Sequence, residues 1–146
     1  MKIQTRYHGE VEAVEKDIWQ FPKGIPGFQD EREFFLYPLA EEEVFFVLQS
    51  TKEPDIAFVV SNPFSFFQAY DFTLDESSIE TLQLEKAEDV QLFVILTLGE
   101  TIETSTANLQ APIVLNVKNH RAKQVILHDT QYKAKHPINQ EVKKGW

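Results

Sequence analysis

The chain has 146 residues, a net charge of −9 and no cysteine, which fits one domain and excludes disulfide bonds and thiolate metal sites. Residues 1–117 carry 21 acidic and 7 basic side chains, whereas residues 118–146 carry 2 acidic and 7 basic ones. A main body this acidic repels phosphate backbones and attracts basic proteins, so we expect no direct nucleic-acid binding.

The N-terminal residues, MKIQTRYHGEVEAV, lack the continuous apolar stretch of a signal peptide. No apolar run along the chain approaches the roughly 18 residues that indicate a membrane span. We therefore expect a cytoplasmic protein with no membrane contact.

Residues 21–28, FPKGIPGF, combine two prolines with two glycines. Proline fixes φ and glycine permits positive φ, so this loop can hold one tight conformation. We expect it to direct Phe21, Ile25 and Phe28 either into one end of the domain, as a plug, or outward, as an apolar patch for a partner.

Short apolar runs rich in valine, isoleucine and phenylalanine dominate the chain, which is typical of an all-β domain. We expect strands at residues 44–48, 56–60, 64–74, 90–98, 111–116 and 123–127. The strand at 64–74 should have one apolar face, which consists of Phe64, Phe66, Tyr70, Phe72 and Leu74. Phe67 is the aromatic exception on the opposite face. Both faces of 90–98 are apolar, so that strand should be central or covered on both sides.

One helix is expected, at residues 75–84. Ser77 and Glu80 have the spacing of a capping box, and Ile79 and Leu82 share one face. Residues 117–122, VKNHRA, form a turn-tolerant connection between the last two strands and predict a β-hairpin.

A sheet of about eight or more strands in a domain of this size must protect its edges, and closure into a barrel does so. We expect a single compact antiparallel β-barrel-like domain with one short helix over residues 1–137, with a two-sheet β-sandwich as the alternative. Residues 138–146, INQEVKKGW, are charged and aperiodic, which predicts a mobile C-terminal tail.

The histidines, serines and glycines form no recognisable catalytic or cofactor motif. His120, His128 and His136 are spaced by eight residues, which suggests a metal site. However, His120 is predicted in a turn, His128 at a strand end and His136 before a proline, so the three side chains are not expected to converge on a zinc ion. No serine lies in a G-x-S-x-G elbow, and no glycine pair forms a phosphate-binding loop. We expect a protein that is not an enzyme and uses no metal or cofactor.

The stretch TANLQAPIVLN, at 106–116, predicts a stiff corner that leads into a strand. Proline at position 112 belongs at the start or edge of a strand. Four polar side chains can bond nearby backbone groups: those of Thr104, Ser105, Thr106 and Asn108. None of these groups performs chemistry by itself.

Together these stretches resemble the FliW family of small cytoplasmic, β-rich bacterial flagellar assembly factors. The resemblance spans about residues 3–137, and TANLQAPIVLN is its most specific element. The other stretches are FPKGIPGF followed by FFLYPL, NPFSFFQAY, EDVQLFVILTL, and KQVIL followed by Tyr132 and His136.

This resemblance implies a regulator that exchanges protein partners. FliW proteins bind CsrA, a small RNA-binding translational repressor, and thereby relieve repression of flagellin synthesis. They also bind newly made flagellin, which titrates them away from CsrA. We expect the same two partners here, and a monomeric protein.

Charge and exposed apolar groups suggest where these partners bind. Acidic side chains would attract a basic RNA-binding protein, and an apolar groove or rim would suit the amphipathic terminal segments of unassembled flagellin. The candidate partner-binding residues are Glu41, Glu42, Glu43, Ile25, Phe28 and Asn108. The alternative function is a small barrel that binds an apolar ligand inside, which requires an interior cavity of about 300 Å³ or more.

Overall fold

The structure, a computed structural model, describes residues 1–40, 44–128 and 130–138. Its described strands are β1 (Lys2–Thr5), β2 (Gly9–Glu12), β3 (Ile18–Gln20), β4 (Glu33–Pro38), β5 (Phe46–Ser50), β6 (Ala57–Ser61), β7 (Val90–Thr97), β8 (Thr106–Ala107), β9 (Ile113–Asn116), β10 (Arg121–Gln124) and β11 (His136–Pro137). The helices are α1 (Glu76–Leu82) and four short 3₁₀ turns, η1 (Glu15–Asp17), η2 (Pro63–Ser65), η3 (Ala87–Asp89) and η4 (Ile102–Thr104).

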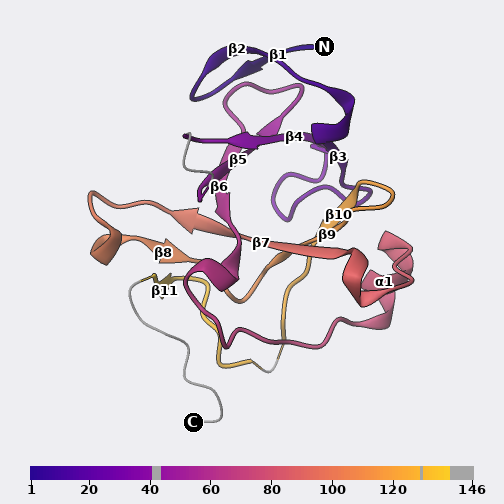
Figure 1. Cartoon of the computed structure of the whole chain (residues 1–146), viewed down its shortest axis with the longest axis vertical. Coiled ribbons are helices and arrows are strands. Elements are labelled where there is room, and N and C mark those ends of the chain that lie inside the picture. The colour runs from indigo at the N-terminus through magenta and orange to yellow at the C-terminus, as the bar shows by residue number, and fades with distance from the viewer. Residues whose placement is uncertain (41–43, 129, 139–146) are drawn as a thin grey trace.

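Seven of these strands close into a barrel (Figure 1), so the barrel expectation is confirmed over the sandwich. Going round the ring, the order is β3, β4, β5, β6, β7, β9 and β10, and β10 returns to β3. Every neighbouring pair in the ring is antiparallel except β10 and β3, which run parallel and meet at Arg121 and Gln20. Closure leaves the ring without the free edges of an open sheet.

The barrel interior is filled by one cluster of buried apolar side chains, to which every ring strand contributes. Its buried members on the strands are Trp19, Phe34, Leu48, Val60, Phe93, Ile113, Leu115 and Ala122. Phe21 and Ile25 enter the same cluster from the loop after β3. Because aromatic rings occupy this space, the interior does not support the alternative of an apolar ligand held inside the barrel.

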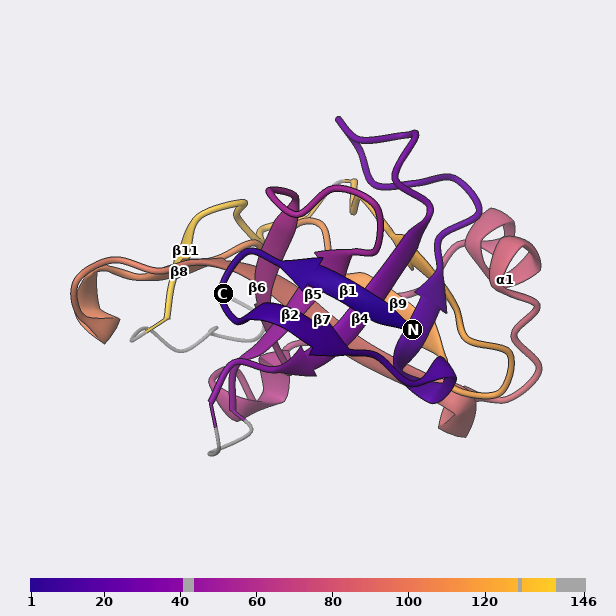
Figure 2. The same cartoon turned by 90° about the horizontal axis from the view of Figure 1, so that it is seen from above.

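Apolar side chains on the outside of the ring are covered by three separate segments. The β1–β2 hairpin lies over β4 and β5 (Figure 2), where Ile3 and Ala13 pack against Phe35, Tyr37 and Val47. Helix α1 covers β9 through Leu82. The loop after η2 packs on β7 and β8. Both faces of β7 are therefore covered, as its two apolar faces predicted.

The strand expected at residues 64–74 does not form. Pro63 begins a 3₁₀ turn, and the Asn62 side-chain oxygen accepts a hydrogen bond from the Phe64 N–H at 2.9 Å. Phe67 is fully buried and Phe64 is 44% exposed, the opposite of what was expected for these two residues, whereas Tyr70 is buried as expected. Local turn chemistry therefore overrides the alternating pattern of aromatic residues.

Helix α1 exists, but its N-cap is Asp75 and not Ser77. The Asp75 Oδ2 accepts a hydrogen bond from the Ser78 N–H at 3.2 Å. Leu82 is buried, whereas Ile79 is 37% exposed, so only one of the two predicted core residues fully enters the core.

Replacing Asp75 with alanine should lower the free energy of unfolding by about 1 kcal/mol at neutral pH, because the cap bond is lost. Hydrogen bonds from Ser78 lower the pKa of the Asp75 carboxyl. Because the pKa is lower in the folded state, the ionised carboxylate stabilises the fold at pH values above its unfolded-state pKa of about 4. This stabilisation is lost as the pH falls through the folded-state pKa. The difference between the variant and the parent should therefore shrink in urea titrations at pH 2.5. Glu76→Ala, one residue further on, is the control, and an unchanged difference at low pH would contradict the assignment.

The β-hairpin expected around residues 117–122 forms, since β9 and β10 pair antiparallel. Its connection is shorter than predicted, because β10 begins at Arg121 and ends at Gln124, whereas the sequence predicted a strand at 123–127. Ile138, the first residue of the predicted tail, is 4% exposed and packs with β7 and β8. The rest of the predicted tail, residues 139–146, lies outside the described residues. In the part of the chain that the structure describes, no helix has the length and apolar character needed to cross a membrane.

Candidate partner-binding surface

Strands β6 and β7 separate soon after they meet. Only two residue pairs join them, Val60 with Ile95 and Ser61 with Val94. Beyond that point β7 turns to pair with β8, through Leu96 and Thr97. The β7–β8 hairpin consequently projects from the side of the barrel (Figure 1).

A groove of about 490 Å³ lies where the two strands separate. Its lining is apolar except for Thr97 and the Tyr7 hydroxyl. The residues that line it are Tyr7, Leu39, Ala57, Phe58, Val59, Ile95, Leu96, Thr97 and Leu98. Tyr7 and Leu98 are each 45% exposed, so both present apolar atoms to the outside at this groove.

The backbone beside this groove consists of strand edges. Ala57 and Val59 pair with β5 on one side and are outside the β6–β7 register on the other. Leu96 pairs with β8, and it too lies outside the β6–β7 register. An apolar groove bordered by strand edges can accept a helix through side-chain contacts or an extended segment through added backbone hydrogen bonds.

The projecting hairpin is held rigid by its own polar side chains. The Ser105 hydroxyl donates to the Thr101 carbonyl and accepts from the Gly99 N–H, each at 2.9 Å. The Thr104 hydroxyl also donates to the Thr101 carbonyl, at 3.0 Å. The Thr104 and Ser105 side chains thus bond nearby backbone groups, as expected for these polar residues, and they brace the loop of the hairpin whose Thr97 and Leu98 line the groove.

Asn108 belongs to this support and not to the groove lining. Its side-chain oxygen accepts from the Ala111 N–H at 3.1 Å, which closes the turn into β9. Leu109 beside it is buried and accepts a hydrogen bond from the Tyr70 hydroxyl at 2.7 Å. The structure therefore gives Asn108 a positioning role.

The loop at 21–28 divides its three apolar side chains between the interior and the surface. Phe21 and Ile25 are buried in the barrel, so the plug expectation holds for them and Ile25 is not accessible to a partner. Phe28 is 40% exposed, and its ring packs edge-to-face on Phe58 at 5.7 Å. Phe58 lines the groove, so Phe28 contacts a groove residue without lining the groove itself.

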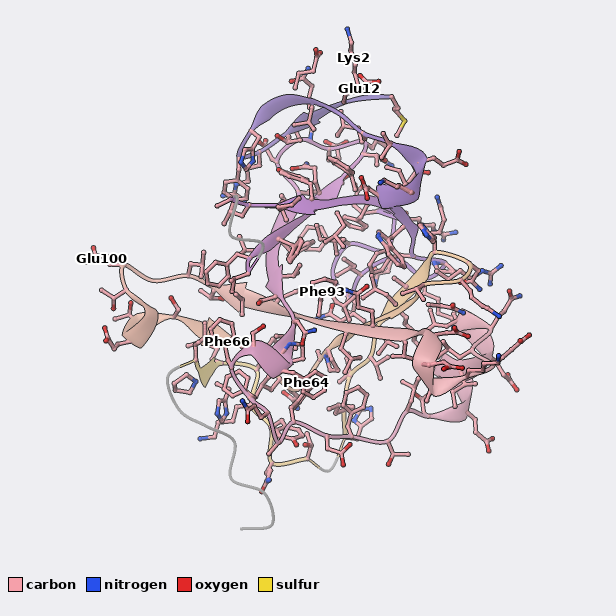
Figure 3. The ribbon with its side chains drawn as sticks, viewed as in Figure 1. Lys2, Glu12, Phe64, Phe66, Phe93 and Glu100 are labelled. Carbon is pink, nitrogen blue, oxygen red and sulfur yellow. The ribbon has the colours of Figure 1, made fainter. Side chains whose placement is uncertain are left out.

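Glu41, Glu42 and Glu43 lie outside the described residues. Glu100 and Glu103 are exposed on the projecting hairpin, and Glu100 lies at its outer end (Figure 3).

The sequence prediction missed Tyr7, Val59 and Leu98 as groove residues. For Leu98 a signal exists, because it continues the apolar face of β7 beyond the last paired residue, directly before Gly99. Tyr7 and Val59 reach the groove only through the folded topology.

The family model described as FliW protein matches residues 2–138 of the chain. A relative named flagellar assembly factor FliW, from Bacillus pumilus (strain SAFR-032), is 54% identical over 136 residues, which cover 93% of this chain and 94% of the relative. The protein of the same name from Bacillus subtilis (strain 168) is 49% identical over 141 residues, covering 97% and 99%. A crystal structure of the flagellar assembly factor FliW matches with a TM-score of 0.89 at 48% identity, covering 97% of this chain and 99% of that one.

Proposed function

Because this chain belongs to the FliW family, we propose that it is a cytoplasmic regulator of flagellin synthesis and flagellum assembly that acts by binding proteins, without chemistry of its own. It binds the translational repressor CsrA and so relieves repression of flagellin translation. Unassembled flagellin binds it in turn and titrates it away from CsrA.

The observation that carries this proposal is the open apolar groove between β6 and β7. It offers about 490 Å³ and a lining of mainly apolar side chains, which suits one face of an amphipathic segment. Unassembled flagellin exposes such segments at its termini. The groove is therefore the proposed flagellin site, with Phe28 at its margin.

The acidic charge supports the second partner. Residues 1–117 carry 21 acidic and 7 basic side chains, and such a surface accelerates encounter with a basic protein. The same charge opposes the approach of RNA to a bound repressor.

A competition titration tests the exchange. The purified protein is mixed with CsrA, the complex is sized by light scattering after gel filtration, and flagellin is then added in steps. We expect a complex with CsrA that disappears as a complex with flagellin forms. Failure to form either complex would overturn the proposed function.

Leu98→Lys should weaken flagellin binding by at least about tenfold, because it places an ammonium group against the apolar segment that the groove accepts. Leu98 is already 45% exposed, so the fold should be preserved. Ile126→Lys is the matched control, since Ile126 is 49% exposed and does not line this groove. Titration calorimetry with flagellin measures both, and equal affinities for the two variants would remove the groove from the flagellin site.

A further inference from the structure

A second, smaller apolar cleft lies on the other part of β7, between the loop after η2 and the turn η3. It has a volume of about 210 Å³, enough for one or two side chains. Phe64 stands at one wall (Figure 3) and Ala87 at the other, with Val114 of β9 among the lining residues. The complete lining is Phe64, Tyr70, Asp71, Phe72, Leu74, Ala87, Val90, Leu92 and Val114.

Residues 71–89 supply several residues of the cleft lining and form the most acidic stretch of this length in the described structure. Residues 71–89 contain seven carboxylates and one lysine, Lys86. Six of the seven carboxylates are on exposed residues, and only Asp89 is buried. One of them, Asp71, lines the cleft, and Glu88 is the residue after Ala87, which also lines it.

In the described part of the chain, no ion pair involves Asp71, and only a long one reaches Glu88. Lys86 reaches Glu88 only at 4.0 Å, in a pair whose side chains are 60% and 77% exposed, so the attraction is weak. Arg121 and Lys123 are held against α1, where Arg121 donates to the Thr81 carbonyl at 3.1 Å and Lys123 to the Ser78 hydroxyl at 2.9 Å. The rim of the cleft therefore keeps its negative charge.

We propose that this cleft is the docking site for a basic protein segment, which inserts one apolar side chain into it and places lysine or arginine against Asp71 and Glu88. An apolar anchor surrounded by complementary charge is a common form of protein recognition. The proposal rests on the proposed function, in which CsrA is the basic partner, and it assigns CsrA to this cleft and flagellin to the β6–β7 groove.

The two sites lie close together on the same strand. Leu92 lines the cleft and Leu96 lines the groove, four residues along β7, which corresponds to roughly 13 Å. A folded protein is wider than this distance. CsrA bound at the cleft and flagellin bound at the groove would therefore overlap, even though their sites are separate. This overlap gives the proposed exchange of the two partners a steric basis.

Charge reversal at the rim tests the assignment. The double variant Asp71→Lys/Glu88→Lys is compared with Glu100→Lys/Glu103→Lys, which changes the net charge equally on the projecting hairpin. Titration calorimetry with CsrA at several salt concentrations should show that the cleft variant binds at least about tenfold more weakly and with a smaller salt dependence. The hairpin variant should remain within about twofold of the parent protein.

Ala87→Trp is a third variant, which fills the cleft without altering charge. It should also weaken CsrA binding by about tenfold and leave flagellin binding unchanged. If the parent binds CsrA but the cleft variants lose no more affinity than the hairpin variant, the docking site is wrong and the proposed function stands. If the parent protein itself binds no CsrA, the proposed function fails.

Discussion

Replacing Gly24 with alanine is expected to lower the free energy of unfolding by at least about 3 kcal/mol. Gly24 has a φ of +67°, in the left-handed region, where a side chain costs about 1 kcal/mol. In addition, a Cβ at this position would lie 2.6 Å from the Cα and the carbonyl oxygen of Gln29. Backbone atoms cannot rotate away from such a contact as the end of a side chain can. The loop must therefore open, which withdraws Ile25 from the barrel interior.

Gly9→Ala separates the two contributions to this effect. Gly9 has a similar φ of +63°, but no atom lies within 4 Å of its added Cβ. It should lose only about 1 kcal/mol, and urea unfolding of both variants at neutral pH measures the difference. Equal losses would show that the close approach of Gln29 does not constrain the loop.

The barrel could be predicted because its strongest signal is local. The alternation in Val90–Thr97 puts apolar side chains on both faces, and the structure covers both. Ring closure could not be predicted in the same way. It depends on β10 meeting β3 in parallel through Arg121 and Gln20, two residues that no turn connects.

The failure at residues 64–74 has a different cause. An alternating aromatic pattern favours a strand, but Asn62 and Pro63 at its start favour a 3₁₀ turn. The turn prevails because Phe67 can then fill the space between β7 and β8. Once the turn shifts the register, Phe64 moves to the surface and forms a wall of the acidic cleft.

The candidate sites were harder to predict than the fold because both depend on where strands part. Leu98 is visibly apolar in the sequence, but it is exposed because β6 pairs with β7 only at Val60 and Ser61, and the residues of β6 before Val60 lie outside this pairing. Phe28 and Ile25 were both candidates for a partner surface, but Phe28 is 40% exposed, whereas Ile25, three residues earlier, is buried. The prolines and glycines indicate a rigid loop without indicating which side chain points inward.

The stretch TANLQAPIVLN ends on Asn116, and this residue explains how helix α1 stays in place. Asn116 is 2% exposed, and its amide nitrogen donates to the carbonyls of Leu82 at 2.8 Å and Gln83 at 3.3 Å. Its side-chain oxygen accepts from the Lys118 N–H at 2.9 Å. One buried side chain therefore satisfies the end of α1 and the turn of the β9–β10 hairpin at the same time.

Asn116→Ala should therefore cost about 2 to 3 kcal/mol of unfolding free energy, because it removes three hydrogen bonds and leaves a buried carbonyl with fewer donors. Asn119→Ala is the matched control, because Asn119 also donates to the Leu82 carbonyl, at 3.0 Å. Asn119 is exposed, so water can replace its side chain as a donor, and the loss of unfolding free energy should stay below about 1 kcal/mol. Urea unfolding measures both, and amide hydrogen exchange in α1 shows whether the helix loosens first. Since α1 connects the two walls of the acidic cleft, loosening it should also weaken CsrA binding. A variant with normal exchange in α1 and unchanged stability would show that Asn116 does not hold the helix.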